Sequence, residues 1–212
     1  MRGIPFLLGL CLLVLSGAAE AQVTSVTGSA TVVSPPASVK TGTGTNSIVF
    51  AEQSGILTSD LGVDISASGT YNSLASLTPG TIAAGTDVSS FYLHSFDATD
   101  SSGTIYSGSI TFSTAILGVE GLDASLVATN SALGSPTTTY FTSAVGQGFE
   151  FGSQIDSLTI NISGDTLTYL DETFGAPDDL RIITAAPEPS ILLMLGSGLF
   201  TLVCFNLKRF LA

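Results

Sequence analysis

The stretch SLTINISGDTLTY, residues 157–169, decides the fold class. Apolar residues in its first half alternate with polar ones, which is the period of two expected of a strand with one buried face. Ser163 to Asp165 interrupts this alternation, and it resumes at Leu167. We therefore expect two antiparallel strands joined by a turn that contains glycine.

Similar short runs, rich in β-branched and aromatic residues, recur between Gly, Pro, Asn and Asp. They lie at residues 48–50, 63–65, 91–93, 108–112 and 180–183. No stretch of twelve or more residues carries a capped apolar stripe at helical spacing. We expect an all-β protein with a single β-sandwich of jelly-roll-like topology over residues 47–186. The Ser/Thr/Gly-rich residues 22–46 are expected to form a leader, either flexible or with an edge strand at Val23 to Val33.

Composition excludes several classes of protein. Of the 212 residues, 44% are apolar and 10% are charged, and the formal net charge is −12. This apolar content can build the core of one domain. Only Lys40 and Arg181 are basic between residues 22 and 186, so nucleic acid finds no basic patch. Cys11 and Cys204 both lie in apolar end segments, which leaves the domain without a disulfide.

The N-terminus has the pattern of a secretory signal peptide, residues 1–21. One base, Arg2, precedes an apolar run from Ile4 to Leu15. The small residues Ala19 and Ala21 then form a small-x-small cleavage site. The alternative is a retained membrane helix, but the apolar run is too short to cross a bilayer. We expect cleavage after Ala21.

The C-terminus carries a second apolar segment, SILLMLGSGLFTLVCFNL, at residues 190–207. A helix of this length spans about 27 Å, which is enough to cross a bilayer core. The alternative, a buried core helix, is disfavoured because the segment has no polar face. The bases Lys208 and Arg209 follow and are expected to stay on the cytoplasmic side. Before the segment stands Pro187-Glu188-Pro189, a stiff tripeptide suited to a helix start.

The order of tripeptide, apolar span, bases and chain end, behind a signal peptide, resembles the PEP-CTERM sorting signal of Gram-negative bacteria. The resemblance covers residues 187–212, about an eighth of the chain. It implies a temporary inner-membrane anchor that an exosortase, a membrane-embedded cysteine protease, recognises before the body reaches the cell surface or the medium. It also implies an association with extracellular polysaccharide. Carried over, the recognition and stop-transfer residues are Pro187, Glu188, Pro189, Lys208 and Arg209.

Residues 48–184 resemble a recurrent, functionally uncharacterised ectodomain of PEP-CTERM proteins. The resemblance implies one domain and no known activity. The segments that carry it are residues 50–53, 79–86, 93–97, 107–119, 133–140, 162–167 and 179–184.

Asp178 and Asp179 precede the last predicted strand, a position from which jelly-roll modules supply acids to a structural calcium ion. Glu52 is the early-strand acid expected to complete the site. The loop at residues 97–103, with Asp97 and Asp100, is a second candidate. The alternative is that these acids end strands and keep the surface soluble.

His94 is the only histidine, and it lies in the apolar run FYLH. It could serve as a general base or a metal ligand, but a buried, hydrogen-bonded histidine is the simpler interpretation. No spacing fixes a pair of carboxylates for glycoside cleavage. With no tryptophan, a sugar platform would depend on tyrosines. These are Tyr71, Tyr92, Tyr106, Tyr140 and Tyr169.

The sequence favours an exported, non-enzymatic protein of the cell surface or extracellular matrix, delivered through a disposable anchor. A calcium-stabilised carbohydrate-binding module is the alternative, and a secreted hydrolase is a more remote one. Expected partners are an exosortase-type protease and extracellular polysaccharide, with no nucleic acid.

Overall fold

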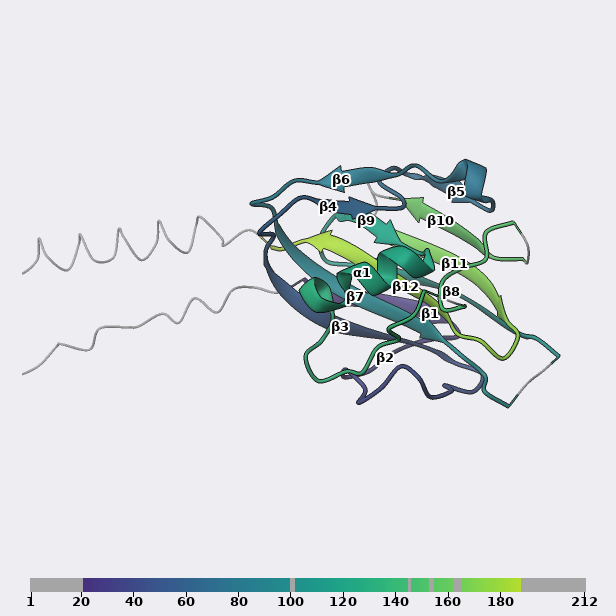
Figure 1. Cartoon of the computed structure of the whole chain (residues 1–212). Helices are drawn as coiled ribbons and strands as arrows, with labels where there is room; N and C mark the ends of the chain where they lie inside the picture. Colours follow the sequence, from purple (N-terminus) through teal and green to yellow (C-terminus); the bar gives the residue numbers. More distant parts are fainter. Residues whose placement is uncertain (1–20, 100–101, 145, 153–154, 162–164, 188–212) are drawn as a thin grey trace, which may run out of the picture. The chain divides into compact units, whose positions relative to one another are not determined.

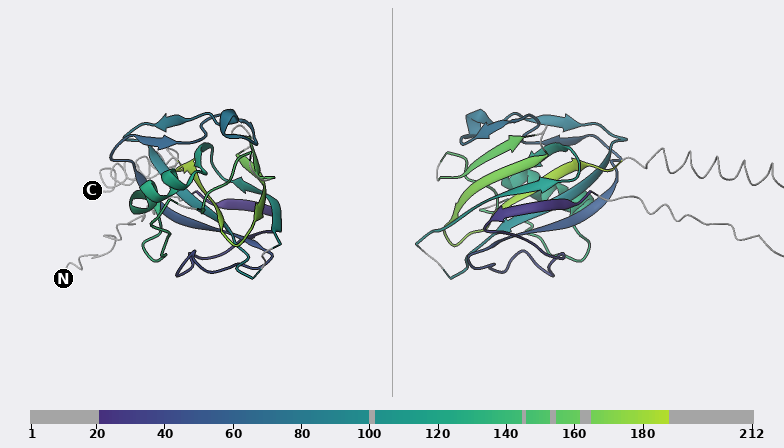
Figure 2. Two further views of the ribbon diagram at one scale, coloured as in Figure 1. Left: turned by 45° about the vertical axis from the view of Figure 1, so that its right-hand side comes forward. Right: turned by 180° about the vertical axis from the view of Figure 1, so that it is seen from behind.

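Two five-stranded sheets form the body of the protein, as the computed structural model shows (Figure 1). The structure describes residues 21–99, 102–144, 146–152, 155–161 and 165–187. Figure 2 shows the layers from two further sides. The predicted all-β sandwich is confirmed.

The first sheet is antiparallel throughout, in the order β1–β8–β11–β10–β5. Its strands are β1 (Val23–Gly28), β8 (Thr104–Phe112), β11 (Thr166–Thr173), β10 (Ser157–Asn161) and β5 (Gly69–Tyr71). The predicted pairing is confirmed, because Leu158 of β10 lies opposite Tyr169 of β11. On the outer face, hydroxyl pairs join neighbouring strands. They are Thr70–Thr159, Ser109–Thr168 and Thr111–Thr166.

The second sheet has the order β2–β3–β7–β12–β9. Its strands are β2 (Ala30–Val32), β3 (Ser47–Ile56), β7 (Asp87–Ser95), β12 (Asp178–Ala185) and β9 (Ile116–Glu120). β2 runs parallel to β3, and the other pairs are antiparallel. The sandwich therefore begins at Val23 and not at residue 47, and the alternative of an edge strand between Val23 and Val33 is confirmed. The segment interpreted as a leader supplies one edge strand to each sheet.

A layer of additional elements covers the outer face of the second sheet. Helix α1 (Asp123–Leu133) packs on this face through Leu126, which contacts a cluster that contains Phe50 and Tyr92. The small sheet of β4 (Leu61–Val63) and β6 (Gly80–Ile82) packs against the same face through Ile183. A short 3₁₀ helix, Leu74–Ser76, lies between β5 and β6. The consequence is that β12 is buried on both faces.

Between the two sheets lies the main hydrophobic core. Leu180 and Ile182 of β12 point into it, whereas the intervening Arg181 points to the outer face beneath α1. This alternation is the period of two of an extended strand. The same alternation makes the two acids of β12, Asp178 and Asp179, point to opposite faces of the sheet.

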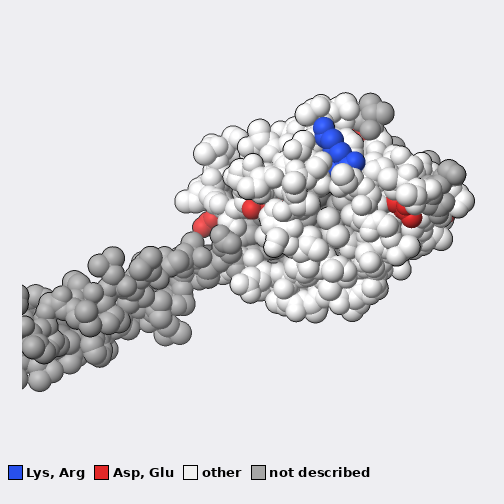
Figure 3. All heavy atoms as spheres, turned by 90° about the horizontal axis from the view of Figure 1, so that it is seen from below, with Lys and Arg blue, Asp and Glu red and all other residues white. Residues whose placement is uncertain are grey.

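Half of the acidic residues that the structure describes are buried. The buried acids are Asp64, Asp97, Glu120, Asp156, Asp171, Asp178 and Asp179. On the face drawn in Figure 3, most atoms belong to uncharged residues. Asp178 is 2% exposed and Asp179 is not exposed at all. The interpretation of these two as solubilising surface acids is therefore wrong.

Within the described residues, no helix is both long enough and apolar enough to cross a membrane. The segment predicted to do so, residues 190–207, lies outside the described residues, as does most of the predicted signal peptide.

Candidate metal centre and buried polar networks

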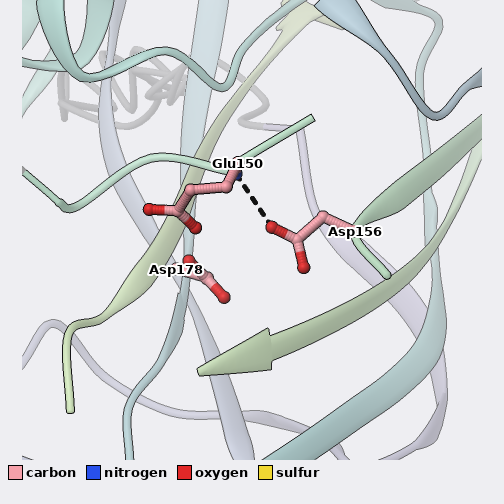
Figure 4. A group of neighbouring side chains, drawn as sticks. All are labelled: Glu150, Asp156 and Asp178. Carbon is pink, nitrogen blue, oxygen red and sulfur yellow. Dashed lines mark hydrogen bonds between the residues drawn. The ribbon is translucent and has the colours of Figure 1, made fainter. Parts of the chain in front are cut away.

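Three carboxylates converge at the end of the sandwich where β12 begins (Figure 4). Glu150, Asp156 and Asp178 each offer one ligand oxygen, and these oxygens lie within 4.8 Å of one another. Asp178 and Asp156 are almost completely buried, and Glu150 is partly exposed. Such convergence of like charge is costly unless protons or a cation neutralise it.

Hydrogen bonds from the backbone hold the side chain of Asp156 in place, and a second set fixes the segment that carries Glu150. Asp156, just before β10, accepts hydrogen bonds from the backbone N–H groups of Glu150 and Glu172, at 2.8 and 3.1 Å. The segment before Glu150 is fixed from α1, because Asp123 accepts the N–H groups of three consecutive residues. These are Gly146, Gln147 and Gly148.

Asp171 of β11 extends the cluster. Ser157 pairs with Leu170 across β10 and β11, so Asp156 and Asp171 occupy the next position in register. Asp171 is 0% exposed, and neither of its carboxylate oxygens accepts a hydrogen bond. The Oδ2 atom of Asp178 also has no partner.

The electrostatics of the cluster are those of acids with no counter-charge. Burial, followed by repulsion from Asp156, Glu150 and Asp171, raises the pKa of Asp178 to about 11. Burial is also the main reason why the pKa values of Asp171, Asp156 and Glu150 are raised. In the absence of a cation, the cluster favours bound protons.

The side chains of the described domain that can carry positive charge, Lys40, Arg181 and His94, make their contacts outside this cluster. Lys40 lies over the ring of Phe141, 5.7 Å from its centroid. Arg181 and His94 belong to two separate networks on the outer face of the second sheet.

Arg181 is fully buried, and all five of its N–H groups are directed at acceptors. Nε and Nη2 bond to the two oxygens of Glu52 at 2.8 and 2.9 Å. The remaining bonds reach α1, whose acceptors are the Leu126 carbonyl, Thr129 Oγ1 and Asn130 Oδ1. Although burial lowers the pKa of Arg181, Glu52 and Glu120 raise it overall. Arg181 is therefore the charged anchor that holds α1 on the sheet.

The second network joins His94, Asp179 and Tyr92. Asp179 Oδ1 lies 2.6 Å from His94 Nδ1, and Asp179 Oδ2 accepts the Tyr92 hydroxyl at 2.9 Å. His94 Nε2 lies 3.2 Å from the carbonyl of Thr41, to which it can only donate. Burial lowers the pKa of His94, but the charge and hydrogen bond of Asp179 outweigh it and raise that pKa overall. His94 is 1% exposed with both nitrogens occupied, which matches the interpretation as a buried histidine.

The predicted calcium residues are not brought together. Asp178 faces the space between the sheets, Asp179 faces outward to His94, and Glu52 pairs with Arg181. Consecutive residues of a strand point to opposite faces, so one ion cannot take both Asp178 and Asp179. In the other candidate loop, Asp97 Oδ1 accepts from the backbone and hydroxyl of Thr99. Asp100 lies outside the described residues.

Of the predicted processing residues, the structure describes two. Ala21 is 4% exposed, and its backbone nitrogen lies 3.4 Å from Ser89 Oγ. Pro187 is the last described residue. The others lie outside the described residues, namely Ala19, Glu188, Pro189, Lys208 and Arg209. Comparison of the chain with protein-family models, curated proteins and solved structures finds no match.

Stability is expected to fall as pH rises through neutrality, and Glu120 is one cause. Burial raises its pKa to about 7, against the opposing effects of Arg181 and Thr129. A raised pKa means that the folded state favours the protonated form. The contribution of protonated Glu120 to the free energy of unfolding is complete below about pH 4.5. It is lost as pH rises through about 7, a change on the order of 3 kcal/mol.

Glu120→Gln cannot ionise, so its free energy of unfolding should fall less between pH 5 and pH 8. Urea unfolding of both proteins at several pH values measures this difference. Asp87→Asn, which changes an exposed acid, is the control and should keep the slope of the unmodified protein. Equal slopes for Glu120→Gln and the unmodified protein would contradict the assignment.

Proposed function

We propose that this chain is an exported, non-catalytic β-sandwich protein, delivered by an N-terminal signal peptide and held temporarily by a C-terminal PEP-CTERM anchor. Exosortase-type cleavage would then release the sandwich to the cell surface or the extracellular matrix of a Gram-negative bacterium. The partners proposed are that protease and extracellular polysaccharide.

The observation that carries this proposal is the position of the two ends of the sandwich. Ala21 contacts Ser89, and the backbone N–H of Ala186 donates to the carbonyl of Asp87 at 3.0 Å. Both ends therefore leave the domain beside the start of β7. Because β1 begins at Val23 and β12 ends at Ala185, cleavage at either predicted site would leave every strand whole.

The finer topology proposed is jelly-roll-like. In support, the chain alternates between the two sheets from β7 to β9, with β7 in the second, β8 in the first and β9 in the second. Such alternation is typical of double-sheet jelly rolls.

Two observations favour this proposal over the alternatives. All five tyrosines are at least nine-tenths buried, so none offers a ring face to a sugar. His94 is enclosed by Asp179 and Thr41, which leaves it no free nitrogen for a substrate. A carbohydrate-binding module and a hydrolase therefore have less support than a non-catalytic exported domain.

Replacing Glu188 with Ala is expected to leave the full-length precursor in the inner membrane, because the change removes the one charge of the recognition tripeptide. Fractionation and immunoblotting of membrane, cell surface and medium measure the distribution. Asp87→Ala is the matched control, since it removes an exposed acid near the same end of the domain, and its distribution should be normal. Normal release of the Glu188→Ala protein at its usual size would refute the recognition step.

A further inference from the structure

We propose that the acidic cluster beside the start of β12 binds one calcium ion, with Glu150, Asp156 and Asp178 as ligands and Asp171 as a fourth surrounding carboxylate. The site differs from the one that the sequence predicted, and it shares only Asp178 with it. Binding of this kind depends on the folded sandwich alone, and not on export or processing.

The geometry suits a cation of this size. Calcium binds oxygens at 2.3–2.6 Å, so oxygens on opposite sides of the ion lie about 5 Å apart. The three ligand oxygens lie within 4.8 Å of one another, and their carboxylates point toward a common space in Figure 4.

The unpartnered oxygens are a second, separate indication. Asp171 is 0% exposed with both oxygens lacking a donor, and Asp178 is 2% exposed with Oδ2 lacking one. Buried polar groups in proteins nearly always have partners, and a buried charge needs a counter-charge. Among the described residues, the only possible cationic partners, Lys40, Arg181 and His94, are engaged elsewhere.

The donor set points to calcium in preference to other metals. The cluster offers carboxylate oxygens alone, with no imidazole or thiolate, which disfavours zinc and copper. Magnesium keeps several water molecules and demands octahedral geometry. Calcium accepts six to eight oxygens in flexible arrangements, which suits a largely enclosed group of acids.

The position of the ion explains what it would do. Asp178 belongs to the second sheet, whereas Asp171 lies in the first sheet and Asp156 directly precedes one of its strands. One ion would therefore join the two sheets at the end of the sandwich where β12 begins, opposite the end where β12 finishes at Ala185. In a domain without a disulfide, this bond would tie the two layers together.

The test is calcium binding by the full-length chain in mild non-ionic detergent, followed by titration calorimetry and thermal unfolding with calcium or a chelator. Calcium at one hundred times its Kd is expected to raise Tm by about 5 to 10 °C. In Asp178→Asn, the affinity should fall at least about tenfold and the rise in Tm should largely disappear. Asp165→Asn, a matched change outside the cluster, should respond as the unmodified protein does.

In chelator, Asp178→Asn should be at least as stable as the unmodified protein, because it removes one of four crowded carboxyl groups. This second measurement separates loss of the ion from loss of the fold. An unchanged Tm in millimolar calcium would overturn the proposal, since protons would then neutralise the cluster. An equal rise in Asp178→Asn, or an equal rise with magnesium, would also overturn it.

Discussion

Replacing Arg181 with Met is expected to lower the free energy of unfolding by about 3 to 5 kcal/mol. The change leaves Glu52 and Glu120 buried without their cation, because both carboxylates depend on this guanidinium. It also removes the three hydrogen bonds that Arg181 donates to α1. Loss of packing against the rings of Tyr92 and Tyr140 adds to the effect.

Urea unfolding at neutral pH measures this loss, with Lys40→Met as the matched control. Lys40 is exposed, so its replacement should change stability by no more than about 0.5 kcal/mol. Adding Glu52→Gln to Arg181→Met should recover part of the loss, because one unpaired buried charge disappears. A loss below about 1 kcal/mol for Arg181→Met would show that the buried ion pair is not what holds α1.

Replacing Asp179 with Leu is expected to cost about 3 kcal/mol. The substitution keeps the approximate volume but leaves His94 Nδ1 and the Tyr92 hydroxyl without their acceptor. Both groups are buried and cannot turn to water. The cost is therefore mainly that of unsatisfied donors.

A second measurement separates this mechanism from simple misfit. Asp179 is what keeps the pKa of His94 above its ordinary value against the effect of burial. In Asp179→Leu the effect of burial is opposed only by the hydrogen bond to the Thr41 carbonyl, so NMR titration should show a lowered pKa for His94. Asp87→Leu is the control for stability and should stay within about 0.5 kcal/mol. A His94 pKa that does not change would contradict the network.

The strands could be predicted because their signal is local. Alternation at residues 157–169 gave the β10–β11 pair, and the run LRII gave β12. Helix α1 was missed because DASLVATNSAL mixes small, polar and apolar residues, and Leu122 at its N-cap offers no capping side chain. Its stability comes from tertiary contacts, chiefly with Arg181, which no local pattern contains.

The acidic cluster could be predicted only in part. Continuing the alternation of Leu167 and Tyr169 by two residues places Asp171 on the buried face, and that signal was present in the sequence. The same rule separates Asp178 from Asp179, which were predicted to act together. Glu150 lies six residues before Asp156, in a segment that Asp123 holds in place, and only the tertiary structure shows that it joins the cluster.

A large group of buried acidic residues distinguishes this domain. The acids at the ends of predicted strands allowed an interpretation as solubilising surface groups, yet the described structure buries seven acids. Of these acids, Glu120 pairs with Arg181 and Asp179 pairs with His94, and others form the cluster proposed to bind calcium. Many of the acids that make the composition negative therefore have roles in the interior of the domain.

Mass spectrometry of both termini of the released protein tests most directly whether the two apolar ends are removed from an exported sandwich. We predict an N-terminus at Gln22 and a C-terminus next to Pro187-Glu188-Pro189, with every strand from Val23 to Ala185 retained. A released protein that still carries residues 1–21 or the segment 190–207 would contradict this account.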